Sequence, residues 1–358
     1  MGTAHNIHTL DEQTRQLIET VRYNCDIADA QNAQENTMCI YLLKMRDYFG
    51  WSNSLPLNAS IPKDKLGKWI NEKEKRWESI YQNEFAPICI DGIELDAFDT
   101  NSINNTLVSR GLLYSAGIGR GGQVHFHLGV EIPFLTDRTK NIYVTSFEYA
   151  RDLTASPAHS IGGAIFLRKE ALQRYIWEKY EEWKWKKPDN AMAKVLNFYP
   201  FETDPMRAVN QMSANEIATT LLHEKGELEA GNILGPQWEE MLMTLSGSRA
   251  EILARATRDH LADCLITLPT LIKEENWPAI HFYFANFEGF RKIIWPELID
   301  IYNNTVANHS LDSLHNYIIN EAQPYWLIHS KNLLQKIKLP NLKLHKEIST
   351  YFERAIGV

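Results

Sequence analysis

The sequence has few cysteines, and no two of them are close together. Four occur among the 358 residues: Cys25, Cys39, Cys89 and Cys264. Their spacing excludes a CxxC motif. A chain of this length buries enough apolar surface to fold without disulfide bonds, so we expect reduced thiols, as in a cytosol.

Long apolar runs and an excess of positive charge are also lacking. No stretch approaches the ~20 apolar residues of a membrane span, and the start, MGTAHNIHTLDEQ, lacks the apolar core of a signal peptide. The net charge of −8 argues against a nucleic-acid or anionic-membrane surface. These absences predict a soluble, cytoplasmic protein that binds neither nucleic acid nor membrane.

The pattern of apolar residues divides the chain into three regions. Residues 1–86 have helical spacing. Residues 87–187 contain short segments rich in β-branched and aromatic residues, followed by a helix over about 169–186. Residues 188–358 are helical again. We therefore expect a predominantly α, α+β protein, with an N-terminal helical segment and a small antiparallel β-sheet packed on a larger C-terminal helical domain.

Local signals in the last region predict two helix starts and one close contact. Ser213 with Glu216, and Ser248 with Glu251, have the spacing of a capping box. Gly226 lies inside a helical pattern, where glycine costs about 1 kcal/mol relative to alanine. Such a glycine indicates the close approach of a neighbouring element.

Three segments of the last region place ionisable side chains where a helix normally has apolar ones. They read LLHEKGELEAG, RATRDHLADCL and PAIHFYFAN. Helical phase places Glu224 on an apolar stripe, and it places Asp259 and Asp263 on a second one. His281 precedes an aromatic run in the third segment. Burying such groups is costly unless they are paired or bound to a metal, so we expect one shared polar site.

Imidazoles and carboxylates on facing helices are typical ligands of zinc, iron and manganese. We expect one of these divalent metals as the cofactor, held by ligands drawn from one set: His223, Glu227, Asp259, Asp263 and His281. Acid–base catalysis would fall to Glu224, Glu227 and His260. The sequence HEKGE is not the HExxH motif of zinc proteases, because Glu227 replaces its second histidine.

A second candidate metal site lies in the segment QVHFHLGVEIPF. His125, His127 and Glu131 share one parity, so an unbroken strand places them on one face of a sheet. HxHxxxE after Gly119 resembles the first metal-binding motif of the cupin family over about a dozen residues. The glycine that this family has after the glutamate is absent, and no clear second motif follows. Alternating polar residues on a solvent-facing sheet would give the same pattern.

These observations favour an enzyme, an oxidase or a hydrolase, that acts on a small-molecule substrate among the C-terminal helices. The pocket holds either a divalent metal or a metal-free acid–base pair, and a homo-oligomer is left open. The alternative is a non-catalytic structural or regulatory binding protein. In that case Arg255, Arg258, Arg291 and Lys292 neutralise the carboxylates in a buried ion-pair network.

Overall fold

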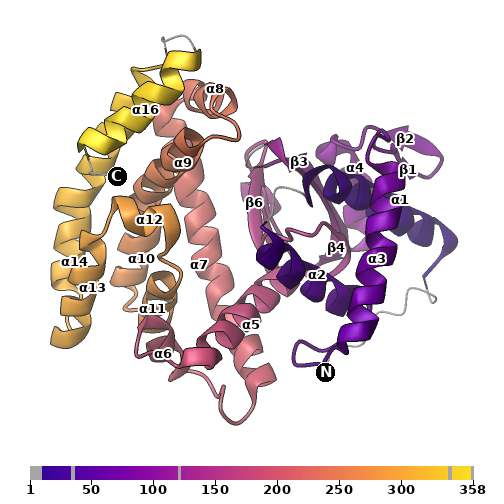
Figure 1. Ribbon diagram of the computed structural model, residues 1–358, viewed down its shortest axis with the longest axis horizontal. Helices are drawn as coiled ribbons and strands as arrows, with labels where there is room; N and C mark the ends of the chain where they lie inside the picture. Colours follow the sequence, from indigo (N-terminus) through magenta and orange to yellow (C-terminus); the bar gives the residue numbers. More distant parts are fainter. Residues whose placement is uncertain (1–9, 34–36, 120–121, 338–340, 356–358) are drawn as a thin grey trace. The chain divides into compact units, whose positions relative to one another are not determined.

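A computed structural model describes residues 10–33, 37–119, 122–337 and 341–355. The chain forms two compact units, Met1–Trp177 and Glu178–Val358 (Figure 1). We call them unit 1 and unit 2. The protein is predominantly helical and carries two small sheets, as the sequence predicts for an α+β fold. Among the described residues, no helix combines the length and the apolar character that crossing a membrane requires.

Unit 1 combines helices with both sheets. Its α-helices and strands are α1 (Glu12–Asn32), α2 (Met38–Ser52), α3 (Lys63–Ile80), β1 (Ile88–Ile90), β2 (Ile93–Leu95), α4 (Thr100–Leu107), β3 (Leu112–Ile118), β4 (Val124–Glu131), β5 (Ile142–Arg151), β6 (Ala158–Ile161) and β7 (Ala164–Arg168). Helix α5 (Lys169–Lys186) begins in unit 1 and continues into unit 2.

The larger sheet has five strands in the order β3-β4-β5-β7-β6. All neighbouring pairs are antiparallel except β5 and β7, which are parallel. His159 of β6 lies 3.0 Å from Ser115 Oγ of β3, although these strands are at opposite ends of that order. The sheet is therefore curled, and its two edge strands approach each other across one face.

The two faces of this sheet differ in polarity. Phe126 and Leu128 of β4 pack with Leu17, Ile18 and Val21 of α1 in an apolar core. His125 and His127 alternate with these residues along β4, so they point to the opposite face. We call this opposite face, lined by Ser115, His125, His127, Glu148, Arg151, His159 and Arg168, the interior face.

Unit 2 is helical throughout its described residues. Beyond the end of α5, its α-helices are α6 (Ala191–Leu196), α7 (Pro205–Leu234), α8 (Pro236–Thr244), α9 (Arg249–Ala262), α10 (Leu268–Lys273), α11 (Trp277–Ala285), α12 (Gly289–Ile294), α13 (Glu297–Asn308), α14 (Asp312–Tyr317), α15 (Gln323–Leu334) and α16 (Asn341–Ala355). Two π-helical segments, Asp263–Thr267 and Ile318–Ala322, continue α9 and α14.

One of the two expected helix starts in unit 2 is confirmed. Ser248 caps α9, and its Oγ accepts a hydrogen bond from the backbone N–H of Glu251 (3.2 Å). The start at Ser213 is wrong, because α7 begins at Pro205 after the cap Asp204 and runs through Ser213 without a break. Ser213 instead donates to the carbonyl oxygen of Asn210, which a serine inside a helix readily does.

Candidate functional site

Asp263 is the centre of the polar cluster that the sequence predicts in unit 2. Its side chain is 0% exposed, and it accepts hydrogen bonds from His223 Nδ1 (2.9 Å) and Tyr283 Oη (2.9 Å). Arg291 Nη2 also donates to this carboxylate. The donors come from α7, α11 and α12, whereas Asp263 begins the π-helical segment after α9. Four elements therefore meet at one buried carboxylate.

Gly226 allows α7 to approach α9 closely at this point. A Cβ atom at position 226 would lie 2.5 Å from the carbonyl oxygen of Ala262. No side chain fits there without moving the backbone, so the close contact expected for Gly226 is confirmed. Asp263 follows Ala262 directly in the chain. The close approach of the two helices therefore brings the carboxylate of Asp263 within reach of His223 on α7.

Glu227 extends the cluster through a second arginine. Its Oε2 accepts a hydrogen bond from Arg258 Nη2 (2.7 Å), and its Oε1 lies 3.3 Å from His223 Nε2. Arg258 also lies 3.3 Å from Glu239 and 3.8 Å from Asp259. We call His223, Glu227, Arg258, Asp263, Tyr283 and Arg291 the helix network.

The charges of the helix network hold His223 in its protonated form. Burial lowers the pKa of His223, but Asp263 and Glu227 on its two nitrogens raise that pKa well above its usual range. Burial opposes ionisation of Asp263, yet Arg291 and His223 lower its pKa to about 2. An imidazolium with both N–H groups engaged has no lone pair for a metal or a proton. His223 is therefore a charged hydrogen-bond donor in this arrangement.

Two predicted histidines lie away from the helix network. His260 is fully buried, and its Nε2 lies 3.0 Å from the carbonyl oxygen of Arg291, with the rings of Trp295 and Trp326 within 5 Å. His281 is buried beside Tyr302, whose hydroxyl lies 2.8 Å from Nδ1. Burial lowers the pKa of His260 to about 3 and that of His281 to about 4. Both are neutral residues of the core.

The remaining predicted residues of unit 2 are Glu224 and Asp259. Glu224 is buried on α7, as its apolar stripe predicts. Asp259 is partly buried beside Arg258, and burial together with the charge of Glu227 raises its pKa to about 6. In the parts of the chain that the structure describes, no group of three or more His, Cys, Asp or Glu side chains has an arrangement that could hold a metal ion. The metal expected here stays a prediction without a ligand set.

The interior face of unit 1 has a second polar cluster, built on the strand that carries the other predicted site. His127 is paired across the sheet with Arg151 and is 1% exposed. Its Nε2 lies 3.4 Å from Glu148 Oε1, and Arg168 Nε donates to the same oxygen. His125 lies 4.4 Å, ring to ring, from His159. Glu131 is separate, because both of its oxygens accept hydrogen bonds from Arg138 (2.8 Å each).

Glycines give the histidines of the interior face their room. A Cβ atom at Gly129 would lie 3.0 Å from His127 Nε2 and 2.8 Å from the carbonyl oxygen of Phe147. A Cβ atom at Gly117 would lie 3.1 Å from His125 Cε1. Each imidazole therefore lies over a glycine of its own or the neighbouring strand. A larger residue at either position would displace the ring.

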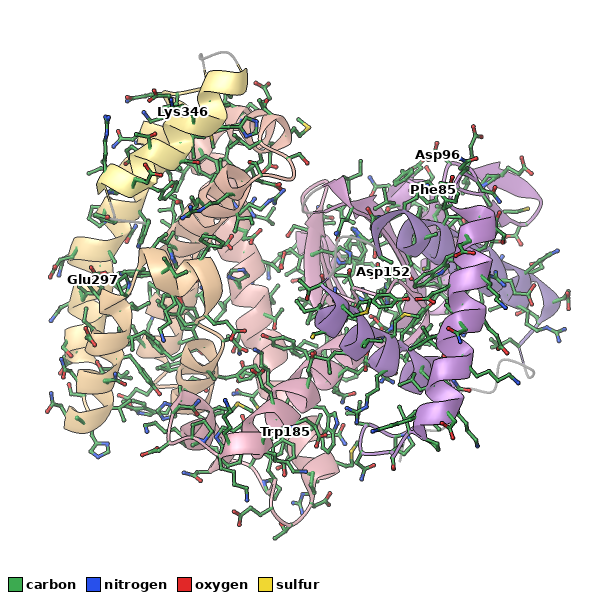
Figure 2. All side chains as sticks on the ribbon, viewed as in Figure 1. Phe85, Asp96, Asp152, Trp185, Glu297 and Lys346 are labelled. Carbon is green, nitrogen blue, oxygen red and sulfur yellow. The ribbon has the colours of Figure 1, made fainter. Side chains whose placement is uncertain are left out.

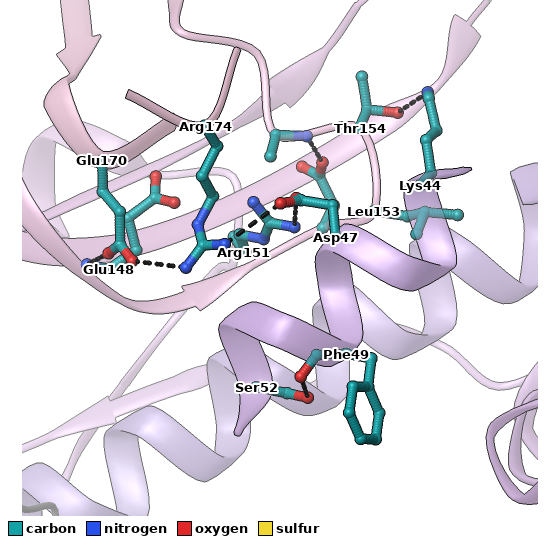
Figure 3. A network of polar contacts seen from close by, with 12 residues as sticks. Lys44, Asp47, Phe49, Ser52, Glu148, Arg151, Leu153, Thr154, Glu170 and Arg174 are labelled. Carbon is teal, nitrogen blue, oxygen red and sulfur yellow. Dashed lines mark hydrogen bonds and ion pairs between the residues drawn. The ribbon is translucent and has the colours of Figure 1, made fainter. Parts of the chain in front are cut away.

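A row of ion pairs joins the interior face to helices α2 and α5 (Figure 3). Asp47 of α2 accepts hydrogen bonds from Arg151 Nη2 (2.6 Å) and Arg174 Nη1 (3.2 Å). Arg174 also donates to Glu170 (3.2 Å), whose second oxygen accepts from the backbone N–H of Glu148 (2.9 Å). Asp47 thus accepts hydrogen bonds from two arginines.

Several buried polar atoms of the interior face have no hydrogen-bond partner among the described residues. They are both ring nitrogens of His127, Nε2 of His125, Nε and Nη1 of Arg151, Nη2 of Arg168 and Oε2 of Glu148. In the helix network the corresponding atoms are one nitrogen each on Arg258 and Arg291. A buried polar atom without a partner costs about 1–3 kcal/mol, so such atoms need an explanation.

The histidines of the interior face are neutral. Burial lowers the pKa of His125 to about 4, and it lowers the pKa values of His127 and His159 as well, with Arg168 contributing in each case. Glu148 is ionised, since Arg168 and His127 lower its pKa against the effect of burial. A neutral imidazole offers one donor and one acceptor nitrogen. The interior face therefore presents donors of both charged and neutral kinds, together with acceptors.

Glu148, Arg151 and Arg168 belong to no motif that the sequence pattern predicts as a site. Glu148 and Arg151 occur in the segment FEYAR, whose other residues are apolar, and Arg168 ends the apolar strand AIFLR. A charged residue in a strand that is otherwise buried is the signal that could have found them. Shared parity with His127 could not have identified Glu148 and Arg151, because that argument requires the register between β4 and β5, which the sequence does not give.

A curled sheet with a buried polar face and a helical unit with a buried ion-pair network define an α+β protein with two polar centres. Residues 16–168 match the N-terminal domain, and residues 173–355 the C-terminal domain, of a family of unknown function, DUF6866. The chain belongs to this family. No curated protein and no solved structure matches the chain.

Proposed function

We propose that the protein is a binding protein for a small polar molecule, and that the interior face of unit 1 is its binding site. The observation that carries this proposal is the state of His127 and Arg151. Each is 1% exposed. Nδ1 of His127 and Nε and Nη1 of Arg151 have no hydrogen-bond partner among the described residues, and Nε2 of His127 has only Glu148 at 3.4 Å. A bound small molecule that supplies the missing partners accounts for such atoms.

We also propose that the site predicted in unit 2, the helix network, has a structural role. Asp263 and Glu227 each accept from at least one cationic side chain, and His223 is held between them. This arrangement agrees with the non-catalytic alternative, in which arginines neutralise buried carboxylates. Arg258 and Arg291 do so, whereas Arg255 pairs with Glu251 instead.

Substitution of His127 by leucine tests the binding site. Leucine has a similar volume and no polar atom, so it removes both buried ring nitrogens, and Glu148 keeps its ion pair with Arg168. We expect the free energy of unfolding of the ligand-free protein to stay equal or to rise by up to about 1 kcal/mol, as at other binding sites that cost stability. The full-length, untagged wild-type protein should release a small molecule on denaturation, identified by mass spectrometry, and the His127→Leu protein should release none.

His315→Leu is the matched control, since His315 is an exposed histidine of unit 2. It should retain the molecule at the wild-type level. A high-resolution crystal structure can overturn the proposal. If ordered water alone satisfies His127 and Arg151 in it, and nothing is released on denaturation, the interior face is not a binding site.

A further inference from the structure

The arginines on and beside the interior face already have counterions. Each of the three is paired with a carboxylate: Arg151 with Asp47, Arg168 with Glu148, and Arg174 with Glu170. Asp152, which Figure 2 labels within unit 1, adds a further carboxylate, and it is buried. An anionic ligand would therefore find no unpaired cation among these three arginines.

One set of open polar atoms belongs to Arg151 and His127, which are partners across β5 and β4. Nε and Nη1 of Arg151 are N–H donors, and both are buried without a hydrogen-bond partner among the described residues. The ionised carboxylate of Glu148, 3.4 Å from His127 Nε2, only accepts hydrogen bonds. The proton of the neutral ring is therefore on Nε2, and Nδ1 keeps a buried lone pair. Open donors and an open acceptor thus lie on neighbouring strands of one face.

A second set of open atoms belongs to the ion pair of Arg168 and Glu148. Arg168 Nε donates to Glu148 Oε1, whereas Nη2 of the arginine and Oε2 of the carboxylate are buried without a partner in the described chain. Glu148 Oε1 also faces His127 Nε2, so the two sets adjoin. Each set combines an arginine donor with an acceptor.

The chemical group that satisfies such a set must both accept and donate. An ionised carboxylate has no hydrogen to donate, and an ammonium group has no lone pair with which to accept. A hydroxyl group has one hydrogen and two lone pairs on a single oxygen, so one hydroxyl can serve each set. Two adjoining sets fit two hydroxyl groups of one molecule.

We propose that the molecule bound at the interior face is an uncharged polyhydroxy compound, a sugar or a polyol. Its hydroxyl groups accept from Arg151 and Arg168, and they donate to Nδ1 of His127 and Oε2 of Glu148. This ligand class rests on the proposed binding site and adds the chemistry that the site selects. Hydrogen bonds to ionised groups are about twice as strong as those between neutral groups, so the two arginines and Glu148 supply most of the affinity.

The molecule that the full-length, untagged protein releases on denaturation gives the first test. We expect mass spectrometry to identify an uncharged compound with two or more hydroxyl groups. A released molecule that is charged, or that lacks a second hydroxyl group, overturns the polyhydroxy ligand and leaves the binding site standing.

Three probes with one carbon skeleton decide the question for protein that releases nothing. Glycerol is neutral, glycerate is an anion, and serinol, with an amino group on the central carbon, is a cation. In ligand-observed NMR titrations at constant ionic strength, we expect glycerol to bind about tenfold more tightly than either charged probe, because burial of an unpaired charge is costly. A charged probe that binds at least as tightly as glycerol overturns the uncharged ligand alone. If no probe binds, both proposals fail.

Arg151→Lys tests the position of the ligand, because lysine keeps the positive charge beside Asp47 and removes the open Nε and Nη1 donors. It should weaken glycerol binding, or binding of the released molecule, about tenfold or more. Arg46→Lys, at an exposed arginine of α2, should bind like the wild type. If Arg151→Lys does not fold, His127→Leu with its control His315→Leu takes its place. Wild-type affinity in the folded variant overturns the assignment of the hydroxyl groups to these residues.

Discussion

The helix network and the interior face are both buried clusters of histidines, carboxylates and arginines, yet they differ in how their polar atoms are satisfied. In the helix network, each carboxylate accepts from a cationic neighbour, and His223 bonds Asp263 through Nδ1 while its Nε2 lies 3.3 Å from Glu227. On the interior face, Nδ1 of His127 and both Nε and Nη1 of Arg151 are buried without a hydrogen-bond partner among the described residues, and Nε2 of His127 has only Glu148 at 3.4 Å. The comparison shows that burial of charge alone does not distinguish a structural core from a binding site. The distinction lies in the hydrogen bonds that the fold leaves open.

The two clusters also differ in what holds them in place. The helix network joins four elements through one carboxylate, Asp263, so its residues depend on one another. The interior face is held by strand pairing, by glycines under the imidazoles and by ion pairs such as that of Arg168 with Glu148. Replacement of one of its neutral histidines leaves these contacts in place. Stability should therefore respond strongly to the loss of Asp263 and weakly to the replacement of a histidine of the interior face.

Removal of the central charge of the helix network should have the largest effect. Asp263→Asn keeps the shape of the side chain but leaves Arg291 and protonated His223 without their buried counterion. Breaking a buried ion pair costs about 3–5 kcal/mol, and the partial exposure of both partners reduces this to about 3 kcal/mol. Peptide-resolved hydrogen exchange of the full-length protein should show the loss of protection in unit 2.

Asp300→Asn is the control for this substitution, because Asp300 is an exposed acid of α13. It should change the free energy of unfolding by less than about 0.5 kcal/mol. Unit 1 should keep its protection in both variants. An equal loss in Asp263→Asn and Asp300→Asn would mean that the helix network does not stabilise unit 2.

The contact between α7 and α9 should give the next largest effect. Gly226→Ala gains helix propensity, but its Cβ meets the Ala262 carbonyl oxygen at 2.5 Å, and the backbone has to move. We expect a net loss of about 1–2 kcal/mol in unit 2, measured by hydrogen exchange in α7 and α9. Gly231→Ala, on the same helix with no atom within 4 Å of its Cβ, should instead stabilise by about 0.5–1 kcal/mol. If Gly226→Ala and Gly231→Ala change the free energy of unfolding in the same direction, α7 does not approach α9 as closely at Gly226 as described.

Much of the fold could be predicted from local pattern, because periodicity and caps act within a few residues. The helix expected over about 169–186 is α5, Lys169–Lys186, and Ser248 caps α9 as its spacing predicts. The error at Ser213 has the same origin, since a capping-box spacing inside a longer amphipathic helix is identical to one at its start. Only the signal further upstream, Asp204 followed by Pro205, distinguishes the two cases.

The candidate sites could be predicted from the sequence less well than the fold, because they depend on tertiary structure. A π-helical segment begins at Asp263, and this change of period cannot be read from residues spaced for an α-helix. His260 and His281 lie in the core, but the sequence pattern around them does not say which neighbour each one meets. On β4, irregular pairing with β5 occurs at Leu128/Gly129 and Gly129/Glu131, so shared parity did not keep Glu131 beside His127.

The pH dependence of stability should separate the two clusters by sign. The folded pKa of His223 is raised above 6.5, so the native state holds more protons than the unfolded state above that pH. Its contribution is present below pH 6.5 and is lost as the pH rises through the folded pKa. For His125, whose folded pKa is about 4, the unfolded state holds more protons between pH 4 and 6.5. Unit 1 should therefore lose stability as the pH falls through that window.

Hydrogen exchange, corrected for the intrinsic rate at each pH, can follow both units in one sample. Replacement of His223 by glutamine should remove the loss of protection in unit 2 above pH 6.5 and leave unit 1 unchanged. Replacement of His125 by glutamine should reduce the loss in unit 1 between pH 4 and 6.5 and leave unit 2 unchanged. The carboxylates of both units titrate in the wild type and in each variant, so the difference between curves isolates one imidazole. If the replacements of His223 and His125 change the pH dependence of protection in the same direction, the two histidines have the same charge state. The contrast between the helix network and the interior face would then be lost.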